Sequence, residues 1–133
     1  MKQISGGVTA AKGFCAASTA AGIKYKDRKD MALIFSKTPC KAAGTFTTNI
    51  VKAAPVKWDQ KIVAESACAH AVVVNAGIAN ACTGQEGMDY CSQTADHAAE
   101  LLKIPADSVL VASTGVIGMQ LPMERIKDGV SAM

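Results

Sequence analysis

The chain has 133 residues, 50% hydrophobic and 19% charged, a balance that excludes an intrinsically disordered segment and suits one domain with a core. Aromatic residues make up only 5%, so we expect a core of small side chains that a partner surface completes. The net charge of +3 divides into a basic half, residues 1–61, and an acidic half, residues 62–133. Single lysines dominate the basic half, which argues against a nucleic-acid-binding protein.

The cysteines and the N-terminal segment bear on the cellular compartment. The five cysteines are odd in number, and their spacing contains no CxxC pair and no zinc pattern. The N-terminal residues lack the leucine-rich stretch of a secretion signal, and no run approaches the roughly 20 apolar residues of a membrane span. We therefore expect reduced thiols, no metal, no membrane partner and a cytoplasmic location.

The first half of the chain predicts two strands and a short helix. Residues 24–30, "KYKDRKD", alternate basic and acidic side chains and are typical of a solvated turn. Strands are expected at 31–36 and 43–50, with Pro39 breaking the ladder between them. A helix is expected over 58–66.

The second half predicts alternating strands and helices. Apolar runs at 69–77 and 108–114 predict buried strands, and a helix should begin near Pro122. The helix over 87–102 has the clearest apolar stripe, formed by Met88, Cys91, Ala95, Ala98, Ala99 and Leu102. This order indicates an α/β or α+β fold, with residues 1–133 as a single domain or part of one.

Several conventional sites fit poorly. The loop 75–87, "NAGIANACTGQEG", follows a strand and precedes a helix, but its glycines match no nucleotide-binding pattern. Asn75 and Asn80 are instead expected to bond the backbone of a tight connection. His70 is expected in the core and His97 in solvent, with no partner pattern for a metal or for cysteine catalysis. No carboxylate lies in an apolar stretch that would raise its pKa.

The stretch "VASTGVIG" at 111–118 places a polar tripeptide between apolar residues. The Thr114 hydroxyl can donate a hydrogen bond, and Gly115 lets its backbone N–H approach a ligand closely. Two donors that converge on one oxygen stabilise the oxyanion of acyl transfer, by about 3–4 kcal/mol each. The tripeptide is therefore a candidate oxyanion hole, although a simple turn remains the alternative.

Five ordered stretches resemble the ornithine acetyltransferases of arginine biosynthesis, the bifunctional glutamate N-acetyltransferase/amino-acid acetyltransferase family. They are "GGVTAAKGF" with "AAGIKY", "KDMALIFS", "AAGTFTTNIVKAAPV", "VVVNAGIANACTG" and "VASTGVIG". The resemblance covers nearly the whole chain. It departs from the family at Ala76 and Ile78, where serine and asparagine are usual, and Asn75 and Asn80 are kept.

The resemblance implies an autoprocessed acetyltransferase. Such an enzyme cleaves itself before a threonine into α and β chains, and that threonine accepts the acetyl group of N-acetylornithine and passes it to glutamate. In this ping-pong reaction no cofactor is needed, Thr114 and Gly115 form the oxyanion hole, and acetyl-CoA as a second donor is left open. This chain would be the N-terminal part of the α chain, without the nucleophile.

The resemblance also implies a layered α/β/β/α sandwich, completed by the β chain and assembled into an α2β2 heterotetramer. One alternative is an amidohydrolase or aminopeptidase on the related self-cleaving fold, which would need water but no glutamate. A non-catalytic interaction domain and a nucleotide-binding module are the remaining alternatives.

Overall fold

The computed structural model describes residues 5–66 and 68–133, which form one four-stranded sheet with helices packed against it. The elements in chain order are the 3-10 turn η1 (Val8–Ala10), β1 (Phe14–Thr19), β2 (Met31–Cys40), α1 (Ala54–Glu65), β3 (Ala69–Ile78), α2 (Gly84–Leu102), the 3-10 turn η2 (Ala106–Ser108), β4 (Val109–Val116) and α3 (Met123–Ser131). The mixed α/β class predicted from the sequence is confirmed. None of the described helices has the length and apolar character needed to cross a membrane.

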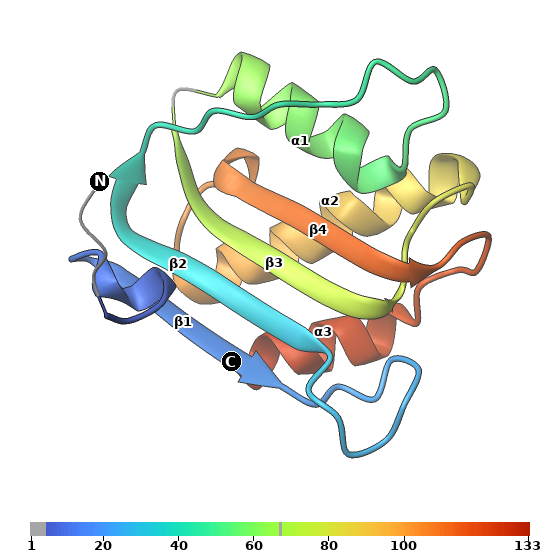
Figure 1. Cartoon of the computed structure of the whole chain (residues 1–133), viewed down its shortest axis with the longest axis horizontal. Coiled ribbons are helices and arrows are strands. Elements are labelled where there is room, and N and C mark those ends of the chain that lie inside the picture. Colours follow the sequence, from blue (N-terminus) through green and yellow to red (C-terminus); the bar gives the residue numbers. More distant parts are fainter. Residues whose placement is uncertain (1–4, 67) are drawn as a thin grey trace.

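The strands lie in the order β1-β2-β3-β4. The first two pairings are antiparallel, whereas β3 and β4 are parallel and are connected through α2. The helices α2 and α3 lie behind the sheet in Figure 1, and among the described residues no helix crosses its front. Because β3 and β4 run in the same direction, their carboxyl ends meet at one edge of the sheet.

The two faces of the sheet differ in burial. Side chains that alternate along β3 and β4 point to opposite faces. We call the face toward α2 and α3 the covered face; Val73 and Val109 on it are 1% and 0% exposed. We call the other side the open face, where Val72, Val74 and Leu110 remain half-buried. The open face is thus apolar, and no helix of the described part of the chain covers it.

Small residues bring α2 close to the sheet. Cys91, Ala95, Ala98 and Ala99 are all buried, as the predicted stripe required, and the core cluster contains Ala95, Ala98 and Ala99 together with strand valines. The helix begins three residues earlier than predicted, at Gly84. It ends at Leu102; the next residue, Lys103, has a left-handed φ of 56° and lies two positions before Pro105.

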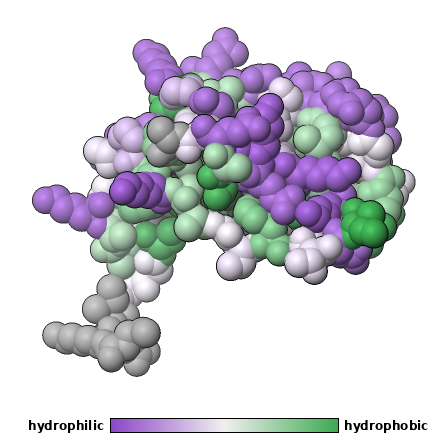
Figure 2. Space-filling model, turned by 90° about the horizontal axis from the view of Figure 1, so that it is seen from above, coloured by the Kyte–Doolittle hydropathy of each residue, from purple (hydrophilic) through white to green (hydrophobic). Residues whose placement is uncertain are grey.

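The helix α1 closes the outer edge of β4. The Trp58 indole N–H donates to the carbonyl of Val109 at 3.0 Å, and the Asp59 carboxylate accepts from the Val111 N–H at 2.9 Å. These bonds occupy backbone groups that an edge strand otherwise leaves unpaired. Viewed from the α1 side, hydrophilic side chains cover much of the surface and separate smaller hydrophobic patches (Figure 2).

The strand predicted at 43–50 is wrong. This segment has no regular structure, and Ile50 is 95% exposed. Side chains bond its backbone locally, because Thr47 Oγ1 accepts from the Asn49 N–H and Asn49 Oδ1 accepts from the Val51 N–H. Such short-range bonds by Thr and Asn compete with a strand ladder.

The boundaries of the other helices and strands differ less from the predicted ones. The helix predicted at 58–66 begins at Ala54, since Pro55 is tolerated in a first helical turn. Pro39 lies inside β2, where the ladder loses its register between Phe35 and Cys40. The strand β1 was not predicted, because its run of small residues carries little β-strand signal. The turn at 24–30 is exposed as predicted, except for the buried Asp30 at its end.

Candidate active site

Thr114 and Gly115 lie at the carboxyl end of β4, opposite Ala76 and Gly77 of β3. Both residues are exposed. Val109 and Val111 point to the covered face, so the alternation of the strand places the Thr114 side chain on the open face. Within the described residues its hydroxyl has no hydrogen-bond partner, which leaves this donor available to a ligand on the open face.

Gly115 allows the two strand ends to approach each other closely. Its φ is +137°, and a Cβ at this position would collide with the backbone of Gly77 and with the nitrogen of Ile78. Gly77 itself has a φ of +112°. Any other residue at position 115 would therefore have to adopt a disfavoured conformation and push the strands apart.

A buried amide ties the same strand ends together on the covered face. Asn75 is 4% exposed, and its Nδ2 donates to the carbonyl of Ile78 at 3.0 Å. The Ser113 hydroxyl donates to Asn75 Oδ1 at 2.6 Å. Both polar ends of the Asn75 side chain are thus satisfied, and the prediction that Asn75 bonds the backbone of this connection is confirmed.

Asn80 organises the next part of the connection. It is 0% exposed and has a left-handed φ of 48°. Its Nδ2 donates to the Gly87 carbonyl at 2.9 Å, its Oδ1 accepts from the Thr83 hydroxyl, and its own carbonyl accepts from the Ala54 N–H. These bonds confirm the predicted role of Asn80 and join the beginnings of α1 and α2.

Backbone bonds continue the pairing beyond the two strands. The Ala79 N–H donates to the Val116 carbonyl at 2.9 Å, and the Gly118 N–H donates to the Ala81 carbonyl at 2.8 Å. The residues after Thr114 and Gly115 are therefore held against the loop that follows β3. Hydrogen bonds therefore hold the chain before the candidate oxyanion hole, where β3 pairs with β4, and also after it.

The remaining candidate side chains do not gather at this site. His70 is half-buried in β3, and its Nδ1 lies 3.1 Å from the Ser36 carbonyl, which fits a satisfied core histidine. His97 is less solvated than predicted, because its Nε2 lies 2.8 Å from the Ser131 hydroxyl. Burial and the nearby Asp59 raise the pKa of the Cys91 thiol to about 12, so this cysteine is inert. The described residues contain no cluster of His, Cys, Asp or Glu able to hold a metal.

Asp59 lies in no apolar stretch of the sequence, yet it has a raised pKa. Burial raises the pKa of Asp59 to about 6, although the bond from the Val111 N–H opposes this shift. The polar neighbours of Asp59 in the sequence gave no sign of this environment, because β4 supplies it from a distant part of the chain. Asp59 holds the middle of β4 through its bond to the N–H of Val111, which lies two residues before Ser113.

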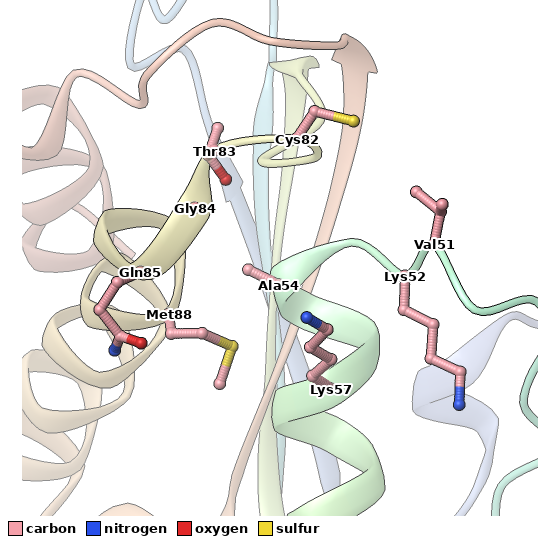
Figure 3. A pocket seen from close by; sticks show the side chains of 9 residues that line it. All are labelled: Val51, Lys52, Ala54, Lys57, Cys82, Thr83, Gly84, Gln85 and Met88. Atoms are coloured by element: carbon pink, nitrogen blue, oxygen red, sulfur yellow. The ribbon is translucent and has the colours of Figure 1, made fainter.

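A separate cavity of about 240 Å³ opens between the beginnings of α1 and α2. Figure 3 shows Lys52 and Lys57 on one side and Thr83 and Gln85 on the other. Its nine lining residues do not include Thr114 or Gly115. The cavity is thus a different feature from the candidate oxyanion hole.

The geometry suits the binding of a developing negative charge. Thr114, which carries a hydroxyl donor, and Gly115, which carries a backbone N–H donor, are both exposed at the end of a strand that backbone bonds hold in place. Donors held in advance stabilise an oxyanion without further reorganisation.

Comparison with known proteins agrees with the resemblance seen in the sequence. The ArgJ family model matches residues 15–133. The arginine biosynthesis bifunctional protein ArgJ of Thermotoga neapolitana is 52% identical over 90% of this chain and 30% of its own length. That of Gloeobacter violaceus is 50% identical over 98% of this chain and 32% of its own. The chain thus spans about a third of the length of these relatives.

Two crystal structures resemble the fold closely. The ArgJ protein of Bacillus halodurans gives a TM-score of 0.89 at 44% identity, covering 94% of this chain and 65% of that one. The ornithine acetyltransferase of Mycobacterium tuberculosis, solved in complex with ornithine, gives 0.91 at 45% identity, covering 96% and 68%. The family match over most of the chain and the agreement of the folds lead to one conclusion: this chain belongs to the ArgJ family.

Proposed function

We propose that this chain supplies the oxyanion hole of an acetyltransferase that moves an acetyl group from N-acetylornithine to glutamate. The observation that carries the proposal is the exposed pair Thr114 and Gly115 on the open side of the sheet, within the family's motif. The Thr114 hydroxyl and the Gly115 N–H are the two donors. The complementary β chain provides the nucleophile, a threonine at its N-terminus.

The proposed reaction has two halves. In the first, the threonine hydroxyl oxygen attacks the acetyl carbonyl of N-acetylornithine, and the free α-amine of the same threonine takes the hydroxyl proton. Thr114 and Gly115 stabilise the negative oxygen of the tetrahedral intermediate. The C–N bond then breaks, and ornithine leaves after taking up the proton. In the second half, the neutral amine of glutamate attacks the acetyl ester and gives one proton to the α-amine of the threonine. The C–O bond then breaks, the threonine oxygen takes up that proton to form the hydroxyl again, and N-acetylglutamate leaves.

The open face of the sheet supports the proposed partner. Val72, Val74 and Leu110 form an apolar surface beside Thr114, and a second sheet packed on it would bury them. That arrangement gives the α/β/β/α sandwich and brings the partner's threonine to the side of the sheet that carries the Thr114 hydroxyl. Two such pairs would form the α2β2 heterotetramer.

Two further assignments belong to the same proposal. The relatives are named bifunctional, and the second activity proposed here is acetylation of glutamate from acetyl-CoA through the same acetyl-threonine. All five cysteines are free, which is consistent with a reducing compartment such as the cytoplasm.

Mass spectrometry of the assembled enzyme, meaning this chain with the complementary chain, tests the proposal. The β chain should gain one acetyl group on incubation with N-acetylornithine and lose it when glutamate is added. Thr114→Ala should slow the gain by about 100-fold, since one donor is removed. Thr9→Ala, at an exposed position in η1, is the matched control and should leave the rate unchanged. Loss of the acetyl group to water without glutamate would instead indicate a hydrolase.

A further inference from the structure

We propose that Asn75 is a positioning residue for the reaction, whose buried amide fixes the direction of the Thr114 hydroxyl and the Gly115 N–H. The inference rests on the proposed function, because it gives Asn75 a kinetic role only if Thr114 and Gly115 bind the oxyanion. Asn75 itself touches no substrate: its side chain lies on the covered face, opposite to the Thr114 hydroxyl.

We call Gly77 and Gly115, which lie opposite each other in β3 and β4, the glycine pair. The two hydrogen bonds of the Asn75 side chain reach residues on either side of this pair. Its Oδ1 accepts from the hydroxyl of Ser113, the residue before Thr114. Its Nδ2 donates to the carbonyl of Ile78, the residue after Gly77. One side chain of β3 therefore fixes β4 directly before the oxyanion donors and fixes the end of β3 directly beside them.

The glycine pair makes such an anchor necessary. Gly77 and Gly115 have φ values of +112° and +137°, and glycine is the residue whose backbone is least restricted by its own structure. The close approach of the two backbones leaves no space for a side chain that could hold Gly115 directly. Backbone bonds hold the residues after Gly115, and Asn75 with Ser113 holds the strand before it, on the covered face.

The chemistry of the bonds requires an amide. At Ser113 the side chain must accept a hydrogen bond, and at Ile78 it must donate one, which asparagine does with its two ends. An aspartate at this position keeps the acceptor but places a negative oxygen against the Ile78 carbonyl. A leucine of similar volume keeps neither bond.

Three variants separate the bonds, and one variant serves as control. Ser113→Ala removes the bond to β4, Asn75→Asp removes the bond to Ile78, and Asn75→Leu removes both. The control is Ser108→Ala, which removes the side-chain bond of another buried serine, to the Pro105 carbonyl at 2.6 Å, just before β4 begins and away from Thr114. Each variant is prepared as the assembled enzyme.

The readouts are the single-turnover rate of acetylation by N-acetylornithine, kcat and KM in steady state, and the melting temperature. We expect rates lower by about 100-fold for Asn75→Leu, about 30-fold for Asn75→Asp and about 5-fold for Ser113→Ala, since small misplacements of catalytic donors carry losses of this order. KM should stay within about twofold, because the oxyanion forms only in the transition state. Ser108→Ala should lower the melting temperature but change the rate by less than about twofold.

Four results would overturn the inference. One is a rate that falls together with the melting temperature to the same extent in Asn75→Asp and in Ser108→Ala, which indicates a structural role for Asn75. Another is a wild-type rate in Ser113→Ala, a result that stays decisive if the Asn75 variants fail to fold. The third is a wild-type enzyme that is never acetylated, which removes the proposed function and this inference together. Normal rates in all the Asn75 and Ser113 variants, with Thr114→Ala slow, remove the inference alone.

Discussion

The covered and open faces of the sheet are built from the same strands but meet different surroundings. Val73 on the covered face is 1% exposed, whereas Val74, the next residue, remains half-buried on the open face. The candidate site follows the same division, because Asn75 and Ser113 bond on the covered side and Thr114 is exposed on the open side. The comparison teaches that the covered face carries the buried support and the open face presents the candidate oxyanion donor.

The largest expected effect comes from placing the same charge on each face. Val73→Asp puts a carboxylate into the closed core and should destabilise the fold by more than about 4 kcal/mol. Val74→Asp should leave the chain folded but prevent its association with the complementary chain. Soluble expression and co-purification with that chain distinguish the two outcomes. Equal loss of soluble protein in both variants would contradict the division into a covered and an open face.

The next effect concerns two glycines at the site end of the sheet. Gly115→Ala should destabilise the chain by about 3 kcal/mol, because its Cβ collides with the Gly77 backbone in a disfavoured conformation. Gly118→Ala also has a positive φ, of +78°, but its Cβ would meet open space, so the expected loss is about 1 kcal/mol. Urea denaturation of the assembled enzyme measures both. A similar loss in the two variants would show that close strand approach contributes little.

The smallest effect concerns Asp59, which supports β4 at its outer edge. Its pKa is about 6 in the fold and 3.8 in an unperturbed chain, so the folded state binds more protons between these pH values. This group therefore makes the protein less stable as pH rises from about 4 to about 6. Asp59→Asn keeps an acceptor for the Val111 N–H and removes the charge.

The expected gain for Asp59→Asn at pH 7 is about 1 kcal/mol, since solvent screens this half-buried carboxylate. The gain should disappear below pH 4, where the native carboxyl is already protonated. Free energies of unfolding at pH 4, 5, 6 and 7 measure the difference. A gain of the same size at every pH would point to a cause other than the charge.

The sequence was sufficient for features that depend on local chemistry. The apolar runs of β3 and β4, the stripe of α2 and the backbone-bonding roles of Asn75 and Asn80 are confirmed. In each case the pattern of neighbouring residues determines the structure. The part played by Thr114 and Gly115 in an oxyanion hole stays a prediction.

Features that depend on distant segments could not be read from the sequence. The raised pKa of Asp59 comes from packing against β4, and the bond between Asn75 and Ser113 joins residues 38 positions apart. The strand wrongly expected at 43–50 shows the opposite error. Its residues have high β propensity but form no strand, because side chains of the same segment accept hydrogen bonds from its backbone. The bonding partner, rather than the residue type, decides each of these outcomes.

The closure of β4 by α1 also limits how larger assemblies can grow. Trp58 and Asp59 already occupy the carbonyl of Val109 and the N–H of Val111, so another chain cannot add a strand along this margin without displacing a helix. The sheet can be lengthened sideways at β1, at the far end from Thr114 and Gly115. Contacts that extend the sheet at β1 and contacts made at Thr114 and Gly115 would thus lie on opposite sides of the sheet's strand order.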